Sequence, residues 1–147
     1  MITPEMRTLI ERNTIGFVAT VTPEGAPAVS PKGTSVVLDE TTLLFSNIRS
    51  PGTVRNIRAN PAVEINFLDV LSRKACRITG RAAYFPQGEA GFAEYLPHFS
   101  RWESLVPMMR GIVRVDVTAA HIIRSPVYDL GAVEAEVIAQ WRAHFAG

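Results

Sequence analysis

Residues 43–61 read LLFSNIRSPGTVRNIRANP. The first five, 43–47, are apolar and then small and polar, which predicts a short β-strand. Ser50 followed by Pro51 is typical of a helix start, because serine caps the first turn and proline fits the first helical position. We therefore expect a strand that leads almost directly into a helix over residues 51–59.

The start of that helix has the composition of an anion site. The first backbone N–H groups of a helix have no partner within the helix, and the helix dipole is positive there. Gly52 lets a ligand approach the backbone, and Ser50 and Thr53 add hydroxyl donors. Arg49 and Arg55 flank the segment with charged donors. Ordinary capping, with two solvated arginines, explains the same residues, so both interpretations stay open.

A second unusual stretch lies upstream, in a strand expected over residues 27–38. It contains Lys32 beside Gly33, in the middle of an alternating pattern. Glycine inside a strand often marks the close approach of a ligand or of another backbone. The alternative is a β-bulge with Lys32 in solvent.

The whole chain predicts one mainly β domain over residues 1–147. Runs rich in β-branched residues, separated by short turns, indicate antiparallel strands. We expect a six-stranded antiparallel split β-barrel with peripheral helices. The strands are expected over residues 15–21, 27–38, 43–47, 62–70, 73–85 and 111–117, the last continued over 121–125 past a bulge. The helices are expected over residues 4–12, 51–59, 86–96 and 132–145, and residues 97–109 are ambiguous.

Composition excludes several classes of function. The net charge is +1, so no broad positive field attracts nucleic acid or anionic lipid. The one cysteine, Cys76, precludes an internal disulfide and suggests a buried thiol, and the three histidines are too far apart to suggest a metal site. No apolar stretch reaches membrane-spanning length and the N-terminus lacks an apolar signal region, so we expect a cytoplasmic protein. Hydrolase, P-loop and dinucleotide-fold motifs are absent from the sequence.

Five short segments in order give the chain a family resemblance. They are Gly25-Ala26-Pro27, Lys32-Gly33, Leu44-Phe45-Ser46-Asn47, Ser50-Pro51 leading through Asn56-Ile57 to Asn60-Pro61, and Val63-Glu64-Ile65-Asn66-Phe67. Over residues 12–85 the chain resembles the pyridoxamine-phosphate-oxidase-like, FMN-binding split barrels.

The resemblance implies a set of cofactor-binding residues. In such proteins the second strand lines the isoalloxazine ring of FMN, which maps to Lys32, Gly33, Thr34 and Ser35. Ser46 and Asn47 match a strand end that contacts polar flavin edges or phosphate, and Ser50, Thr53 and Arg55 match the phosphate-holding helix start. Members of the family often have a basic residue at the position of Thr53 and basic residues near Ser30 and Ser35. This chain departs from that pattern, and Lys32 and Arg55 are the charges that would compensate. A homodimer with flavin between its subunits is also implied.

The expected function is an FMN-dependent oxidoreductase acting on an unidentified small substrate or a nicotinamide. No catalytic residue is assigned. The chain lacks the C-terminal Arg-x-His signature of the vitamin-forming oxidases, so pyridoxine chemistry is not expected. The alternative is a non-catalytic module that stores or senses flavin, the deazaflavin F420 or haem, and the sequence does not separate FMN from F420.

Overall fold

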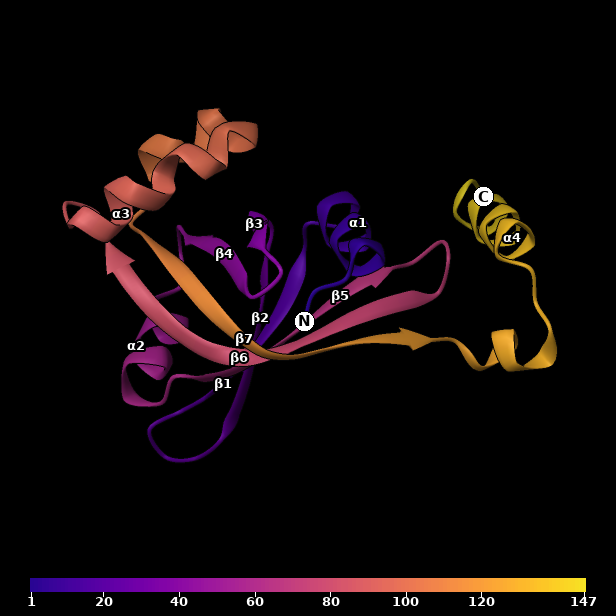
Figure 1. Cartoon of the computed structure of the whole chain (residues 1–147), viewed down its shortest axis with the longest axis horizontal. Helices are drawn as coiled ribbons and strands as arrows, with labels where there is room; N and C mark the ends of the chain where they lie inside the picture. Colours follow the sequence, from indigo (N-terminus) through magenta and orange to yellow (C-terminus); the bar gives the residue numbers. More distant parts are fainter.

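The computed structural model describes all of residues 1–147 and is built around one antiparallel sheet (Figure 1). Its seven strands are β1 (Gly16–Val21), β2 (Pro27–Lys32), β3 (Ser35–Asp39), β4 (Thr42–Asn47), β5 (Ala62–Asp69), β6 (Lys74–Pro86) and β7 (Gly111–Arg124). The helices are α1 (Pro4–Arg12), α2 (Pro51–Ala59), α3 (Ala90–Tyr95) and α4 (Glu134–Phe145), with 3-10 segments η1 (Leu96–Met108) and η2 (Pro126–Leu130).

The strand order explains why the sheet curls into a barrel. The order is β2-β1-β5-β6-β7-β4-β3, so β2 and β3 lie at opposite edges of the sheet. Only Gly33 and Thr34 separate these two strands along the chain. The two edges must therefore meet at this corner, and a split β-barrel results, as the sequence predicts. The single strand expected over residues 27–38 is wrong in one respect, because it breaks at the corner and raises the strand number from six to seven.

Strands β6 and β7 form a long ribbon that joins the barrel to the C-terminal part of the chain. Their pairing shifts register between Thr79 and Gly80, where Thr118 is the additional residue on β7. The bulge expected in this strand is thus confirmed. The ribbon continues beyond the barrel, and η2 and α4 lie at its far end (Figure 1).

The interior is one large apolar cluster closed by α1. This helix contributes Met6, Leu9 and Ile10, the three residues that its sequence pattern places on one face. Cys76 and Ile78 of β6 point inward and are fully buried. Burial raises the pKa of the Cys76 thiol to about 11, so it stays protonated and packs as a small apolar group.

A smaller cluster lies under α3 and η1. It consists of Leu44, Phe92, Phe99, Met109 and Ile112. The helix expected over residues 86–96 begins later, at Ala90, because Pro86 still pairs with Gly111 as the last residue of β6. The ambiguous residues 97–109 are mostly 3-10 helix.

The last helix, α4, is held to the far end of the ribbon by charged and aromatic contacts. Lys74 forms an ion pair of 3.2 Å with Glu134, and the Arg73 guanidinium lies 3.3 Å from the centroid of the Trp141 ring. None of the helices has both the length and the apolar character needed to cross a bilayer.

Candidate anion and cofactor site

The N-terminus of α2 lies where β4 ends, and its first turn is available to a ligand. The helix packs against β1 and β6 through its buried side chains Thr53, Val54, Asn56 and Ile57. Ser50 occupies the N-cap position, but its side chain makes no capping hydrogen bond. The backbone N–H groups of Gly52 and Thr53 have no acceptor within the chain. Two donors of a positive helix end are therefore free.

Lys32 places a buried positive charge beside this helix end. The side chain is only 5% exposed, and its ammonium group donates hydrogen bonds to the Ser30 hydroxyl (2.8 Å) and the Ser50 hydroxyl. It forms no ion pair with any carboxylate. Burial lowers the pKa of Lys32, because desolvation disfavours the charged form. A buried ammonium with one donor left over and no acidic partner is poised to receive an anion.

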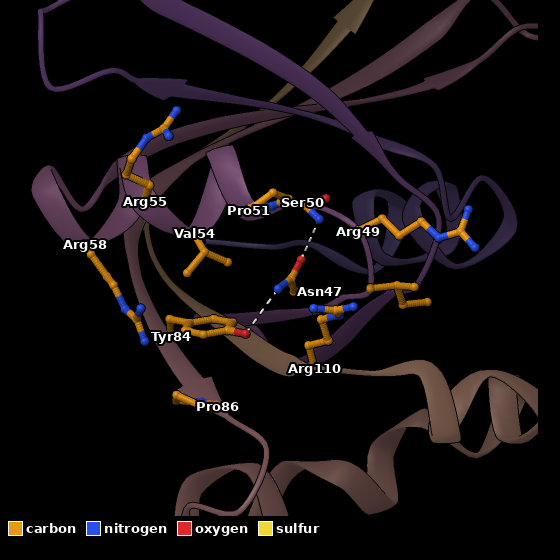
Figure 2. Close-up of a pocket in the computed structure, with 11 residues that line it drawn as sticks. Asn47, Arg49, Ser50, Pro51, Val54, Arg55, Arg58, Tyr84, Pro86 and Arg110 are labelled. Atoms are coloured by element: carbon orange, nitrogen blue, oxygen red, sulfur yellow. Dashed lines mark hydrogen bonds between the residues drawn. The ribbon is translucent and has the colours of Figure 1, made fainter.

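Asn47 fixes the connection between β4 and α2. Its Oδ1 accepts a hydrogen bond of 3.0 Å from the Ser50 backbone N–H, and its Nδ2 donates one of 3.1 Å to the Tyr84 hydroxyl (Figure 2). Asn47 thus positions the helix start through both ends of its amide and also lines the larger cavity described below.

Two cavities adjoin the α2 N-terminus and share part of their lining. The smaller one, of about 320 Å³, has many hydroxyl groups in its lining, with Thr20, Thr22, Ser30 and Ser50 among them. The larger one, of about 670 Å³, is lined by four arginines together with Tyr84 and apolar side chains. Arg49, Ser50, Pro51 and Arg55 border both cavities.

Asn56, which lines the smaller cavity, has an unsatisfied polar atom. The Asn56 side chain is only 3% exposed, and its Nδ2 donates a hydrogen bond of 3.0 Å to the Thr20 hydroxyl. Its Oδ1 is buried and has no hydrogen-bond partner. Such orphan acceptors are rare in folded proteins and call for an explanation, of which a ligand donor is one.

The predicted site residues fall into two groups in the structure. Asn47, Ser50, Thr53 and Arg55 line one or both cavities, and Lys32 reaches them through Ser50. The remaining four, Gly33, Thr34, Ser35 and Ser46, lie at the barrel corner and line neither cavity.

The corner residues are largely engaged with one another. The Thr34 and Ser46 hydroxyls lie 2.6 Å apart, and the Ser46 backbone N–H donates to Thr34 Oγ1 at 3.2 Å. Ser35 is buried as well. Gly33 is exposed, and a Cβ built on it would meet nothing within 4 Å, so a planar ligand has room to approach its backbone.

Five further residues of the site were not predicted: Thr20, Asn56, Arg58, Tyr84 and Arg110. Arg58 follows Arg55 by one helical turn, which is a signal that sequence alone offers. Tyr84 and Arg110 reach the site only through the pairing of β6, β7 and β4, and no local pattern marks them.

Comparison with known proteins agrees with this architecture. A family model described as pyridoxamine 5'-phosphate oxidase matches residues 2–124. No curated protein is similar enough to count as a match.

Several solved structures share the fold. HupZ from Group A Streptococcus has 25% sequence identity and a TM-score of 0.68, covering 85% of this chain and 96% of its own. A protein described as an F420 reductase has 28% identity and a TM-score of 0.61, covering 78% of this chain and 94% of its own. A pyridoxamine 5'-phosphate oxidase-related, FMN-binding protein from Nostoc punctiforme has 15% identity and a TM-score of 0.62, covering 83% and 84%, and supports the fold alone.

Proposed function

The chain belongs to the pyridoxamine 5'-phosphate oxidase family of FMN-binding split barrels, and we propose that it binds FMN with the phosphate at the N-terminus of α2. The observation that carries this proposal concerns Lys32. Its ammonium group is buried, has no carboxylate partner and lies beside the unpaired N–H groups of Gly52 and Thr53. A phosphate would accept from all three donors and would compensate the lysine charge.

The smaller cavity suits the rest of the cofactor chain. The ribityl chain of FMN carries hydroxyl groups, each of which can donate a hydrogen bond. Asn56 lines the same cavity as Ser50 and Thr53, and its Oδ1 is a buried acceptor that lacks a donor. A ribityl hydroxyl at this position would satisfy it. The donor set and the orphan acceptor together fit a phosphorylated polyol better than a neutral apolar ligand.

We further propose that the protein is an FMN-dependent oxidoreductase. When bound, FMN supplies the ring that exchanges electrons with a substrate, and the chain contributes binding, orientation and electrostatics. In this arrangement Lys32 and the α2 N-terminus fix the phosphate end, Asn56 fixes the polyol, and the open backbone at Gly33 borders the ring. The redox chemistry would thus lie in the cofactor, in keeping with the lack of an obvious acid–base pair among the site residues.

A homodimer is part of the proposal. Three large apolar side chains are exposed on one side of the barrel: Ile15 (54%), Phe17 (44%) and Val29 (65%). Phe17 and Val29 lie on the outer face of β1 and β2, and Ile15 directly precedes β1. Phe17 pairs with Pro31, and Ala19 pairs with Val29, so these residues form a continuous apolar strip. A second copy of the chain would remove this strip from water.

The deazaflavin F420 is the second candidate ligand. The solved structure with 28% identity is described as an F420 reductase. F420 also joins a planar ring to a polyol and a phosphate, so Lys32 and Asn56 would serve it in the same way.

Titration with each cofactor tests the proposal. The purified protein is mixed with FMN or with F420, and fluorescence quenching and the visible spectrum are recorded. We expect saturable binding of one of them, and anaerobic stopped-flow mixing with reduced nicotinamides then tests for electron transfer. Absence of saturable binding of both below about millimolar concentration, a free energy of roughly −4 kcal/mol, would refute cofactor binding. A haem-like spectrum in the purified protein would point instead to a haem-binding module.

A further inference from the structure

The four arginines of the larger cavity have no acidic partner. They are Arg49, Arg55, Arg58 and Arg110, and all four are exposed. None of them forms an ion pair, whereas Arg7, Arg77, Arg114 and Arg124 elsewhere on the surface each contact a carboxylate. No aspartate or glutamate lines the cavity. The cavity, called the arginine cavity below, therefore concentrates positive charge without compensation.

Tyr84 gives the arginine cavity a planar wall. The guanidinium carbon of Arg58 lies 5.2 Å from the centre of the Tyr84 ring, and Figure 2 shows Arg58 and Arg110 on opposite sides of that ring. The ring fits there because residue 111 is glycine: a Cβ at Gly111 would collide with the Tyr84 side chain. Ile48, Val54 and Pro86 add apolar surface.

The flavin phosphate does not account for all of these arginines. Figure 2 shows Arg55 directed away from Tyr84, and its Nη2 lies 4.0 Å from the position of a Cβ on Gly52, which places it over the α2 N-terminus. Arg55 lines both cavities, and its guanidinium lies on the side of the α2 N-terminus that Lys32 also reaches. A single phosphate already finds Lys32, Arg55, Ser50 and two backbone N–H groups there. Arg58 and Arg110 line only the larger cavity.

We propose that the arginine cavity binds a second molecule, a small co-substrate that carries at least two phosphate or carboxylate groups on an apolar or planar body. This proposal deepens the proposed function and rests on it, because the co-substrate is the molecule that would exchange electrons with the bound flavin. A cavity of about 670 Å³ lies within the usual size range of small-molecule sites. Arginine guanidinium groups pair with phosphate and carboxylate through two parallel hydrogen bonds, and an aromatic wall accepts a planar body.

Isothermal titration of anions into the FMN-saturated protein, at fixed ionic strength, tests this proposal. The probes are orthophosphate, tripolyphosphate and citrate. We expect tripolyphosphate or citrate to bind about tenfold more tightly than orthophosphate, because two or more arginines engage at once. The tighter of the two polyanions assigns the natural ligand to phosphates or to carboxylates.

Two matched double variants locate the binding. Arg58→Gln with Arg110→Gln should weaken polyanion binding by about tenfold or more, a loss of at least one strong charge-assisted contact. Arg81→Gln with Arg142→Gln removes two exposed arginines that form no ion pair and lie outside the cavity, and should leave binding unchanged. Thermal unfolding of each variant shows whether the fold is retained.

The remaining outcomes separate this proposal from the proposed function. Equal polyanion binding in the two double variants would overturn the inference, and so would a parallel loss of FMN in the Arg58 and Arg110 variant, since the cavity would then serve the flavin phosphate. If the wild-type protein binds no FMN, the flavin proposal fails. The same titrations in the flavin-free protein would still decide whether Arg58 and Arg110 hold a polyanion.

Discussion

Lys32 and Ser50 are 18 positions apart in the sequence, yet the lysine ammonium group donates a hydrogen bond to the serine hydroxyl. This contact joins the corner that closes the barrel to the N-cap of α2. The Ser50 hydroxyl makes no capping hydrogen bond to its own helix and accepts from Lys32. The contact leaves the first-turn N–H groups open beside a buried charge, and the proposed phosphate site is built on that combination.

The first prediction concerns the two side chains at the start of α2. Arg55→Ala should weaken FMN binding by about tenfold, near 1.4 kcal/mol. This value is at the lower end for a charge-assisted contact, because Arg55 is exposed. Thr53→Ala should give a smaller loss of the same kind. Riboflavin lacks the phosphate, so its affinity should hardly change. Fluorescence titration of both ligands measures this, with Arg81→Ala as the control, and equal losses for FMN and riboflavin would count against the assignment.

The second prediction concerns the orphan acceptor in the smaller cavity. Asn56→Ala should weaken FMN and riboflavin to the same extent, because both carry the ribityl chain whose hydroxyl is proposed to meet Asn56 Oδ1. Thr20→Val is the matched control, since it breaks the same internal hydrogen bond and leaves Oδ1 in place. If Thr20→Val weakens both ligands as much as Asn56→Ala does, Oδ1 has no role in binding.

Much of the fold could be predicted because its signals are local. The strand-to-helix step over residues 43–59 is encoded by Ser50, Pro51 and the apolar run before them, and the structure has it with β4 ending at Asn47 and α2 beginning at Pro51. The break at Gly33 could not be predicted in the same way. It depends on β2 and β3 lying at opposite edges of one sheet, which is a long-range property of the strand order.

The site shows the same division between local and long-range information. Ser50, Thr53 and Arg55 lie within the first two turns at the start of α2, so their shared location follows from the helix. Tyr84 meets Asn47 only because β6, β7 and β4 pair in a particular register. Asn56 looks like an ordinary polar helix residue, and it is buried only because α2 packs against β1.

The third prediction is a pH dependence. Burial lowers the pKa of Lys32 below its ordinary value of 10.5, and a bound phosphate favours the charged form. FMN affinity should therefore fall as the pH rises toward 10.5 and Lys32 loses its proton, whereas riboflavin affinity should fall less. Titrations at several alkaline pH values measure the difference between the two ligands. A constant ratio of the two affinities across this range would contradict a role for the Lys32 charge.

The fourth prediction follows from the same lowered pKa of Lys32 and concerns the stability of the protein without ligand. Between the lowered pKa of folded Lys32 and 10.5, the unfolded chain binds more protons than the folded chain, so the unfolding free energy rises with pH in this window. Relative to Lys32→Met, the wild-type protein should gain stability as the pH rises through the window. Urea unfolding of both proteins at several pH values measures this. A difference between them that does not change with pH would mean that burial of the charge has no effect.

The fifth prediction concerns assembly. Light scattering of the wild-type protein should give twice the 16.1 kDa chain mass, because a partner would cover the strip of Ile15, Phe17 and Val29. Phe17→Glu with Val29→Glu should shift the protein toward the monomer. Leu130→Glu is the control, since Leu130 is 88% exposed and lies in the C-terminal segment. A wild-type monomer at micromolar concentration would contradict the proposed dimer.

The proposed FMN site depends on the buried ammonium of Lys32 serving as the phosphate receptor, and a comparison of FMN with riboflavin tests this role. FMN and riboflavin are titrated into the wild-type protein and into Lys32→Met, a variant of similar side-chain length whose folding is checked by thermal unfolding. We expect the wild-type protein to bind FMN about tenfold or more tightly than riboflavin, because the phosphate adds at least one strong charge-assisted contact. Lys32→Met should lose most of that preference and keep its riboflavin affinity. An unchanged preference for FMN in Lys32→Met would show that the phosphate is held elsewhere.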